Sequence, residues 1–411
     1  MSELILKVRQ AIALPFGWVL PGVQTRSRSA VVSADGRLYA LDFARFMAMV
    51  FMMQGHVLDA VVSQSYISVT EFPWNIWHIV RGFTAPTFLM VSGAVHVFAT
   101  RREEDGTVKA DLLSRRIRWA LTIIGIGYFM MFPANSLWDL PYVQPVTWNT
   151  FLAVNILHLT GVTLLLYVLV AASTKNVQQL GRRALGVSIA ILALTPLMQN
   201  PSVTAGLPKW LVPYINISTG SLFPVFPFAA FLFVGLFVGS LMHAAPREQR
   251  NEVLKTYAWR IGLITALLGF LATYIMQKTG VNPEYYSSSM SIPTFVLRVG
   301  VVLCFFSLSV WILERTWSLR NWYSVLGKKS LYIYIIHLVL LFGTPWASSF
   351  GRTHYRALSL QQGIVVALII ILVTLAIAIT MDWIGRQKWF ERKKQIVQYA
   401  LLGTIAFVLF T

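Results

Sequence analysis

Hydrophobic and polar residues follow one another along this chain in long blocks. Apolar stretches close to the length of about 20 residues that a helix needs to cross a bilayer recur throughout and are separated by shorter polar connections. They predict eleven spans, near residues 38–60, 78–100, 117–135, 151–172, 184–200, 222–243, 260–277, 292–313, 331–349, 360–383 and 396–410. We therefore expect an all-α integral membrane protein, a polytopic bundle of about 10–11 transmembrane helices.

The polar connections leave no room for a separate soluble domain. We expect a cytoplasmic basic lead-in at 1–37, a transmembrane domain at 38–383, and a basic loop with an additional C-terminal helix at 384–411. Within the lead-in, Pro15, Gly17 and Pro21 interrupt the apolar stretch that follows Lys7 and Arg9. This pattern favours an amphipathic segment on the inner face over a cleaved signal peptide.

Composition supports the membrane class, because 56% of the residues are hydrophobic and only 12% are charged. A net charge of +18 raises the question of nucleic acid. With the N-terminus inside, 27 of the 34 Lys and Arg residues fall on the inner side, 4 in outer loops and 3 within spans. This asymmetry is a positive-inside signal. It accounts for the charge without nucleic acid and predicts a multi-pass plasma membrane protein, in the inner membrane of a bacterium.

Four ionisable residues interrupt the first span, "LDFARFMAMVFMMQGHVLDA" at 41–60: Asp42, Arg45, His56 and Asp59. Helical geometry places Arg45 and His56 on one face, about 16 Å apart along the axis. Asp42 and Asp59 each lie three residues from one of them, at ion-pairing distance. Charged groups within a span usually face an interior cavity. Ion pairs between helices, or a histidine bonded to a neighbouring helix, are the structural alternative.

Depth along the other spans defines two further groups. Arg81, Asn155, His158 and Arg298 lie at a depth similar to that of His56, and we expect them to ring a chamber on the outer side. On the inner side, His96 and His337 accompany Arg45, together with the loop residues Arg115, Arg116 and Arg118. Converging basic residues of this kind bind phosphates, although basic inner loops are also ordinary topology signals.

These groups suggest a donor that lies lengthwise through the protein, and coenzyme A has this shape. Its phosphates would bind Arg115, Arg116 and Arg118, with Arg45 and His337 along the pantetheine arm. The acyl group would then reach His56, whose ring Asp59 could orient. His56 would act as a general base or as a nucleophile, with Arg81 stabilising the oxyanion and His158 beside them in the catalytic group.

The acceptor would enter from the outer side. Arg298 and Asn155 in the expected chamber, and Trp148 in an outer loop segment rich in aromatic residues, are the candidates for contact with a sugar. We attribute the methionines of "MAMVFMM" to packing rather than to copper binding. The single Cys304 excludes a disulfide framework, and no metal site is predicted.

At these residues the sequence resembles a family. The segment "RLYALDFARFMAMVFMMQGH", with ten residues between arginine and histidine, resembles the signature of membrane acyltransferase family 3, and "RRIR" resembles its Arg-x-x-Arg element at Arg115 and Arg118. The ordered set "RGFTAPTFLMVSGA", "NILHLTGVTLLL", "FPVFPFAAFLFVGLFVG" and "LGKKSLYIYIIHL" is similar to the heparan-α-glucosaminide N-acetyltransferase-like branch. The resemblance covers about residues 37–345.

The resemblance implies a helical membrane enzyme that takes an acyl group, most simply acetyl, from cytoplasmic acyl-CoA to an outer-face sugar, glycan or glycolipid. Two departures accompany it. Phe46 stands where the family usually has glycine after the first-span arginine, a position that glycine uses for close helix contact. The heparan-type branch places its key histidine in the first outer loop, which makes His78 a rival to His56.

Two other classes of function remain open at this stage. Buried His, Arg and Asp residues also serve proton-coupled transporters and exporters. Against a transporter, the two halves show no convincing internal repeat, and such repeats are common in transporter folds. A catalytically silent member that binds lipid or assists glycan export would keep the same fold. A tunnel open to both faces with His56 on its wall would favour the enzyme.

Overall fold

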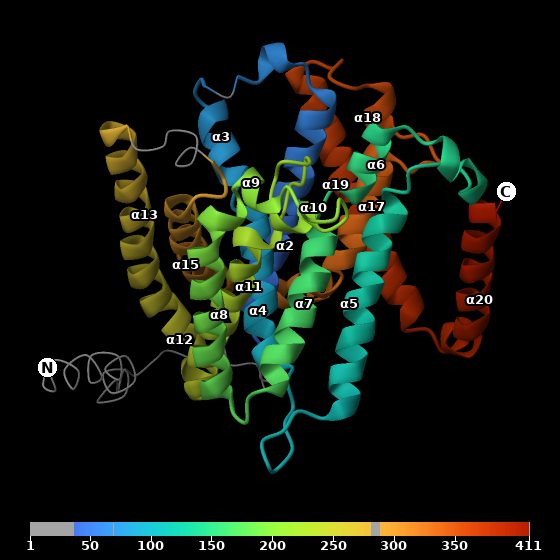
Figure 1. The fold of residues 1–411 in the computed structure, drawn as a ribbon. Helices are drawn as coiled ribbons and strands as arrows, with labels where there is room; N and C mark the ends of the chain where they lie inside the picture. The colour runs from blue at the N-terminus through green and yellow to red at the C-terminus, as the bar shows by residue number, and fades with distance from the viewer. Residues whose placement is uncertain (1–36, 69, 281–287, 411) are drawn as a thin grey trace, which may run out of the picture.

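A computed structural model describes residues 37–68, 70–280 and 288–410, and most of these residues are helical (Figure 1). Within these residues, β-structure is limited to isolated bridges, such as that between Val62 and Leu358. The all-α prediction is therefore confirmed for the described residues. Except for Arg37, the predicted lead-in at 1–37 lies outside them.

Each of the eleven predicted spans overlaps one long helix. These helices are α2 (Tyr39–Val61), α4 (Thr84–Phe98), α5 (Ala110–Met130), α7 (Ile156–Ala172), α8 (Val177–Met198), α11 (Val225–Ala244), α13 (Trp259–Thr279), α15 (Ile292–Arg315), α17 (Ser330–Phe342), α19 (Leu360–Gly385) and α20 (Lys388–Phe410). Shorter helices precede or connect them: α3 (Trp74–Arg81), α6 (Pro145–Leu152), α9 (Pro201–Thr204), α10 (Val212–Ile215), α12 (Arg250–Val253), α16 (Arg320–Lys328) and α18 (Phe350–Thr353).

The polytopic membrane architecture is supported by the length and apolar composition of these helices. Among the described residues, five helices are long and apolar enough to cross a membrane, and up to seven if each bent pair forms one span. The bent pairs are α6 with α7, at 47°, and Trp317–Lys328 with α17, at 65°. Helix α4 has only 15 residues and α2 carries charged side chains, so eleven crossings stay a prediction.

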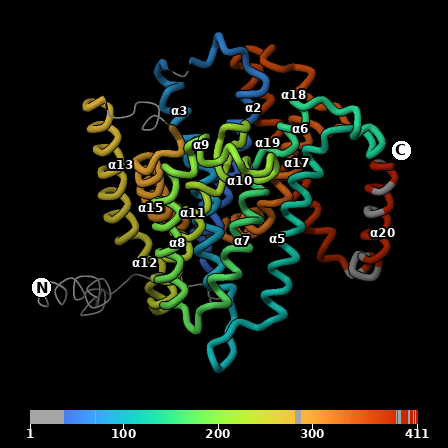
Figure 2. The backbone as a smooth tube through the Cα atoms, in the orientation of Figure 1, coloured from blue at the N-terminus to red at the C-terminus, as the bar shows by residue number. Residues whose placement is uncertain are grey.

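The long helices stand side by side, with α2, α4 and α11 in the middle of the bundle (Figures 1 and 2). Helix α11 is apolar on all sides, as expected of a helix surrounded by others, and packs against α4 and α8. Helices α13 and α20 lie at opposite edges (Figure 2). Helix α2, which carries Arg45 and His56, thus lies where its side chains can face a shared cavity.

The two ends of the bundle are named here by the arginines nearest to them. The Arg45 end carries the connection from α4 to α5 and the connection from α7 to α8, and the Arg81 end carries α3 and α18 (Figure 1). The basic segment around 101–118 and that around 175–183 therefore lie at the same end. This arrangement is the one that the charge asymmetry predicts.

Helices α4 and α11 touch through their backbones. A Cβ atom on Gly239 would lie 2.6 Å from the carbonyl oxygen of Ala94, and one on Gly235 would collide with the carbonyl oxygen of Met90. On the facing helix, a Cβ on Gly93 would likewise collide with the backbone of Leu232. Small residues four positions apart let membrane helices approach this closely. The glycines of "FVGLFVG" are therefore required by helix packing.

The contact between α2 and α16 accounts for Phe46. Its ring stacks on Tyr323 of α16, with centroids 6.2 Å apart and planes 26° apart. Close approach at this crossing is supplied by the partner helix, because a Cβ on Gly327 would lie 2.7 Å from the carbonyl oxygen of Asp42. The tight helix contact expected of glycine after Arg45 is thus made by a glycine on α16 instead.

Candidate functional site

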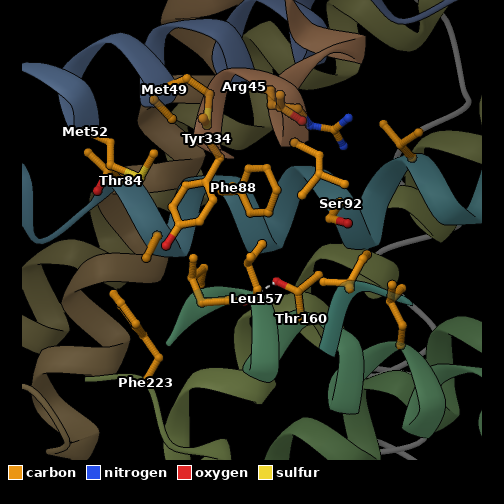
Figure 3. A pocket seen from close by; sticks show the side chains of 18 of the residues that line it. Arg45, Met49, Met52, Thr84, Phe88, Ser92, Leu157, Thr160, Phe223 and Tyr334 are labelled. Atoms are coloured by element: carbon orange, nitrogen blue, oxygen red, sulfur yellow. Dashed lines mark hydrogen bonds between the residues drawn. The ribbon is translucent and has the colours of Figure 1, made fainter. Parts of the chain in front are cut away.

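A cavity of about 260 Å³ runs between α2, α4, α7 and α17. Figure 3 shows Arg45 and Ser92 toward one end and Met52, Thr84 and Phe223 toward the other. Its walls are mainly apolar, and they include Arg45 and His56. The prediction that these two residues share one face of the first span, lining a common cavity, is confirmed.

A second cavity, of about 510 Å³, lies toward the Arg81 end. Its ionisable lining residues are His56, Asp59, His78, Arg81 and Arg298. Met52, Thr84 and Phe223 line both cavities, and His56 is the one ionisable residue, among those described, that lines both. His78 faces only the second cavity. Of the two rival histidines, His56 is thus the one placed between the cavities.

His56 is held by a second histidine. Its Nδ1 lies 3.1 Å from Nε2 of His337, and the two rings stack with centroids 5.4 Å apart. His337 is fully buried, and its Nδ1 lies 2.9 Å from the carbonyl oxygen of Ile333 in the preceding turn of α17. The expectation that His337 would lie with Arg45 is therefore wrong. Helix α17 begins at Ser330, within one residue of the predicted span, but the chain bends by 65° just before it. Depth counted along the chain therefore did not show which part of α2 His337 would face.

Asp59 does not contact His56 as predicted, but forms an ion pair with Arg81. Asp59 is exposed at the end of α2, and the guanidinium of Arg81 reaches it from α3 across Gly55. A Cβ at Gly55 would lie 2.7 Å from Arg81 Nε, and the guanidinium carbon lies 4.5 Å from the centre of the Trp77 ring. Three neighbours therefore fix Arg81 in the second cavity.

Asp42 and Arg45 also separate. Asp42 accepts a hydrogen bond of 2.6 Å from Arg37 Nε, so the predicted ion pair with Arg45 is not formed. Among the described residues, Arg45 makes no ion pair, and its buried Nε has no hydrogen-bond partner. The guanidinium carbon lies 5.8 Å from the ring of Phe88. A half-buried cation that forms no ion pair with a described residue therefore borders the first cavity.

Arg298 is a second such cation, at the other end. Its Nη1 donates to the carbonyl oxygen of Ser289 at 3.2 Å, and no described carboxylate forms an ion pair with it. Gly82 leaves room for it, because a Cβ there would lie 3.2 Å from Arg298 Nη2. Arg81 and Arg298 thus line the expected outer chamber.

Asn155 and His158 do not line this chamber. They form the N-terminal cap of α7: Asn155 Oδ1 accepts from Leu157 N at 2.9 Å, and His158 Nδ1 accepts from Asn155 N at 3.3 Å. His158 is fully buried, with its ring 4.1 Å from that of Tyr128. The prediction placed them by depth in one continuous helix. The chain instead breaks before Ile156, and these side chains satisfy the free amides of the new helix end.

Trp148 lies on α6 and contacts Phe151 edge to face, with ring centroids 5.6 Å apart. It lines neither cavity. The break between α6 and α7, at which the pair bends by 47°, separates α6 from the wall of the first cavity that α7 forms. Contact of Trp148 with a sugar in these cavities is therefore not supported by its position.

The three arginines of "SRRIRW" differ in their surroundings. Arg116 donates to Tyr167 Oη, to Thr100 Oγ1 at 3.0 Å and to the carbonyl oxygen of Ala99 at 3.0 Å, so it ties α5 to α4 and α7. Arg115 and Arg118 are exposed. Arg115 precedes Trp119, a residue that lines the first cavity, by four positions and so shares its side of the helix.

Other residues of the first cavity were not singled out from the sequence. Lys328, at the end of α16, and Tyr334, on α17, both line it. Lys328 was visible only as one of many basic residues in inner segments. His96, which the sequence did place with Arg45, lines the cavity as well, with Nδ1 2.6 Å from the carbonyl oxygen of Ser92. Within the described ranges, no group of three or more His, Cys, Asp or Glu residues is arranged to hold a metal ion.

Comparison with known proteins places this site in a family. Residues 37–279, more than half of the chain, match the family model of heparan-alpha-glucosaminide N-acetyltransferase, catalytic. No match to a curated protein was found. The matched segment contains Arg45, His56, Arg81 and the arginines of α5, whereas Arg298 and His337 lie beyond it. The chain therefore belongs to the heparan-alpha-glucosaminide N-acetyltransferase catalytic family, a family of membrane acetyltransferases.

Proposed function

We propose that this protein takes an acetyl group from acetyl-CoA, bound from the cytoplasmic side, to a hydroxyl or amine of a sugar, glycan or glycolipid at the outer face. The observation that carries this proposal is the position of His56 on the walls of both cavities. The first cavity leads toward the Arg45 end and the second toward the Arg81 end. A donor and an acceptor that enter from opposite ends would meet at His56.

The first cavity has the properties that the donor requires. It is mainly apolar, which suits the pantetheine arm, and Arg45 and Lys328 add positive charge to its wall. Arg115 extends this positive charge along the side of α5 that carries Trp119. The phosphates of coenzyme A would bind at this end, because guanidinium groups hold phosphate oxygens in two-point contacts.

The chemistry follows from the meeting of both cavities. His56 removes the proton from the acceptor hydroxyl or amine as its oxygen or nitrogen attacks the thioester carbonyl. The new C–O or C–N bond forms, the C–S bond breaks, and the thiolate of coenzyme A takes up the proton that His56 received. Because both substrates reach His56 together, direct transfer is favoured over an acetyl-histidine intermediate.

Arg81 is proposed to stabilise the negative charge that develops on the carbonyl oxygen. Its position is fixed by Asp59, Trp77 and Gly55 before any substrate binds. Hydrogen-bond donors that are already in position before the substrate binds are effective, because they need no reorganisation during the reaction. Arg298 is proposed to bind the acceptor, since no described carboxylate neutralises its charge in the second cavity.

The first test is transfer by the full chain reconstituted in lipid vesicles. Acetyl-CoA labelled in its acetyl group is supplied with glucosamine as a probe acceptor, and free thiol and acetylated amine are measured. We expect release of coenzyme A thiol in step with acetylation. Folded protein that neither binds acetyl-CoA nor releases thiol would overturn the proposal. Proton-coupled flux of solute by that same protein would then establish the transporter alternative.

The position of Arg115 predicts that its replacement weakens the binding of acetyl-CoA. Arg115→Ala is expected to raise the KM for acetyl-CoA by about tenfold, as for loss of one charge-assisted hydrogen bond, with kcat nearly unchanged. Arg118→Ala is expected to have the smaller effect, since Arg118 does not share the side of Trp119. Arg182→Ala, an exposed arginine of α8 at the same end, is the control for loss of surface charge. Equal KM values for Arg115→Ala and Arg182→Ala would contradict this assignment.

The position of Arg298 predicts that its replacement weakens the binding of the sugar that accepts the acetyl group. Arg298→Met should raise the KM for glucosamine by about tenfold, because one charged hydrogen-bond donor is lost, while binding of acetyl-CoA stays as in the wild type. Arg352→Met, an exposed arginine at the Arg81 end, serves as the control. A loss of acetyl-CoA binding in Arg298→Met would instead place this arginine on the donor side.

A further inference from the structure

We propose that His337 is a positioning residue that holds His56 in the tautomer with its proton on Nδ1, so that Nε2 is free to accept the proton of the acceptor. This inference rests on the proposed function and deepens it by assigning a task to a residue beyond the segment that matches the family. Two successive hydrogen bonds and one ring nitrogen without a partner carry it, from the backbone of α17 to the wall shared by the two cavities.

The first contact fixes the proton of His337. Its Nδ1 lies 2.9 Å from the carbonyl oxygen of Ile333, and a carbonyl oxygen can only accept a hydrogen bond. His337 Nδ1 therefore carries a proton and donates it. This bond lies within one turn of the same helix, so its acceptor does not depend on contact with another helix.

The second contact transfers this constraint to His56. His337 is fully buried, and no described carboxylate forms an ion pair with it, so a second proton would create an uncompensated charge in the interior, which is costly within a membrane. Its Nε2 is therefore unprotonated and accepts a hydrogen bond. The atom 3.1 Å away is His56 Nδ1, which must be the donor.

The third step leaves the reactive nitrogen of His56 free. With the proton on Nδ1, the lone pair of the neutral imidazole is on Nε2. Within the described ranges His56 Nε2 makes no hydrogen bond, while the side chain lines both cavities. A free imidazole prefers the opposite tautomer, in which Nε2 is protonated and is no base. The hydrogen bond that His56 Nδ1 donates to His337 Nε2 selects the tautomer that leaves Nε2 of His56 free.

A carboxylate often has this orienting task, and here Asp59 is the nearest candidate by sequence. Asp59 is occupied by Arg81 at the end of α2, so the backbone carbonyl of Ile333 stands at the end of the chain of contacts instead. This series of hydrogen-bonded groups, from Ile333 through His337 to His56, carries no formal charge. It can therefore be buried without a counter-ion, which suits a site within the membrane.

The kinetic test compares two replacements of His337. His337→Phe keeps a ring at this buried position but removes the hydrogen-bond acceptor, and kcat should fall by about 10–100-fold, the range for partners that orient a functional histidine. The KM for acetyl-CoA should stay within about twofold of the wild type, since His337 does not line the cavity proposed for acetyl-CoA. His337→Gln can place an amide oxygen where Nε2 was and should restore kcat to within about fivefold of the wild type. His243→Phe, at the far end of α11, controls for loss of a histidine.

The structural test measures the tautomer itself. Nitrogen-15 spectra of histidine-labelled protein distinguish protonated from bare ring nitrogens, and His56→Gln assigns the signals of His56 among the seven histidines. We expect Nδ1–H in the wild type and a shift toward Nε2–H in His337→Phe. Wild-type His56 protonated on Nε2, or an active His337→Phe with unchanged tautomer, would overturn the inference. Folded wild-type protein that neither binds acetyl-CoA nor releases thiol would overturn the proposed function alone, because the spectra test the tautomer independently.

Discussion

His56→Ala is expected to lower acetyl transfer by about 10²–10⁴-fold, the contribution of a positioned general base. The reason is its place on the wall common to both cavities, where it is the one described ionisable residue that can reach substrates from either end. Binding of acetyl-CoA should survive, because the proposed phosphate contacts lie three helical turns away, at the Arg45 end. The substitution thus separates catalysis from binding.

The measurement is transfer by reconstituted protein, with acetyl-CoA binding followed separately by calorimetry. His78→Ala is the informative companion, since His78 lines the second cavity but not the first. We expect it to keep kcat within about tenfold of the wild type, less than the loss expected of a general base. The opposite ranking, with His78→Ala inactive and His56→Ala active, would transfer the catalytic role to the histidine of α3.

Gly235→Leu is expected to destabilise the protein by roughly 3 kcal/mol or more, the upper range for overpacking a well-packed interior. A Cβ at this position collides with the carbonyl oxygen of Met90, which is backbone and cannot rotate away. Helix α4 would have to separate from α11, and the walls of the first cavity on α4 would move with it. We therefore expect both a lower melting temperature in detergent and loss of acetyl-CoA binding.

Gly186→Leu is the matched control, because Gly186 lies in α8, another long apolar helix, and a Cβ there meets nothing within 4 Å. Its replacement should leave the melting temperature unchanged or raise it slightly, since glycine disfavours a helix by about 1 kcal/mol relative to alanine. If both variants unfold at the wild-type temperature, the crossing of α4 and α11 does not depend on close backbone contact.

The sequence was sufficient to predict a helical membrane protein and to predict that the site extends along the first span, from Arg45 to His56. Block lengths of apolar residues located each long helix in the described part of the chain, because the thickness of the bilayer sets the length of a span. Helical periodicity placed Arg45 and His56 on the wall of one cavity, because residues eleven positions apart are separated by about three turns and lie on the same face. The positions of Arg81 and Arg298 in the outer chamber also followed from depth alone.

Contacts between helices were decided only by the fold. His56 and His337 are 281 residues apart, and no periodicity within either helix says which faces meet. The same limit applies to the acidic residues, since Asp42 and Asp59 were paired by proximity in sequence but found Arg37 and Arg81 instead. A break before α7 turned Asn155 and His158 into a cap. Local spacing determines depth and direction along one helix, whereas the partner of a polar group depends on how separate helices pack.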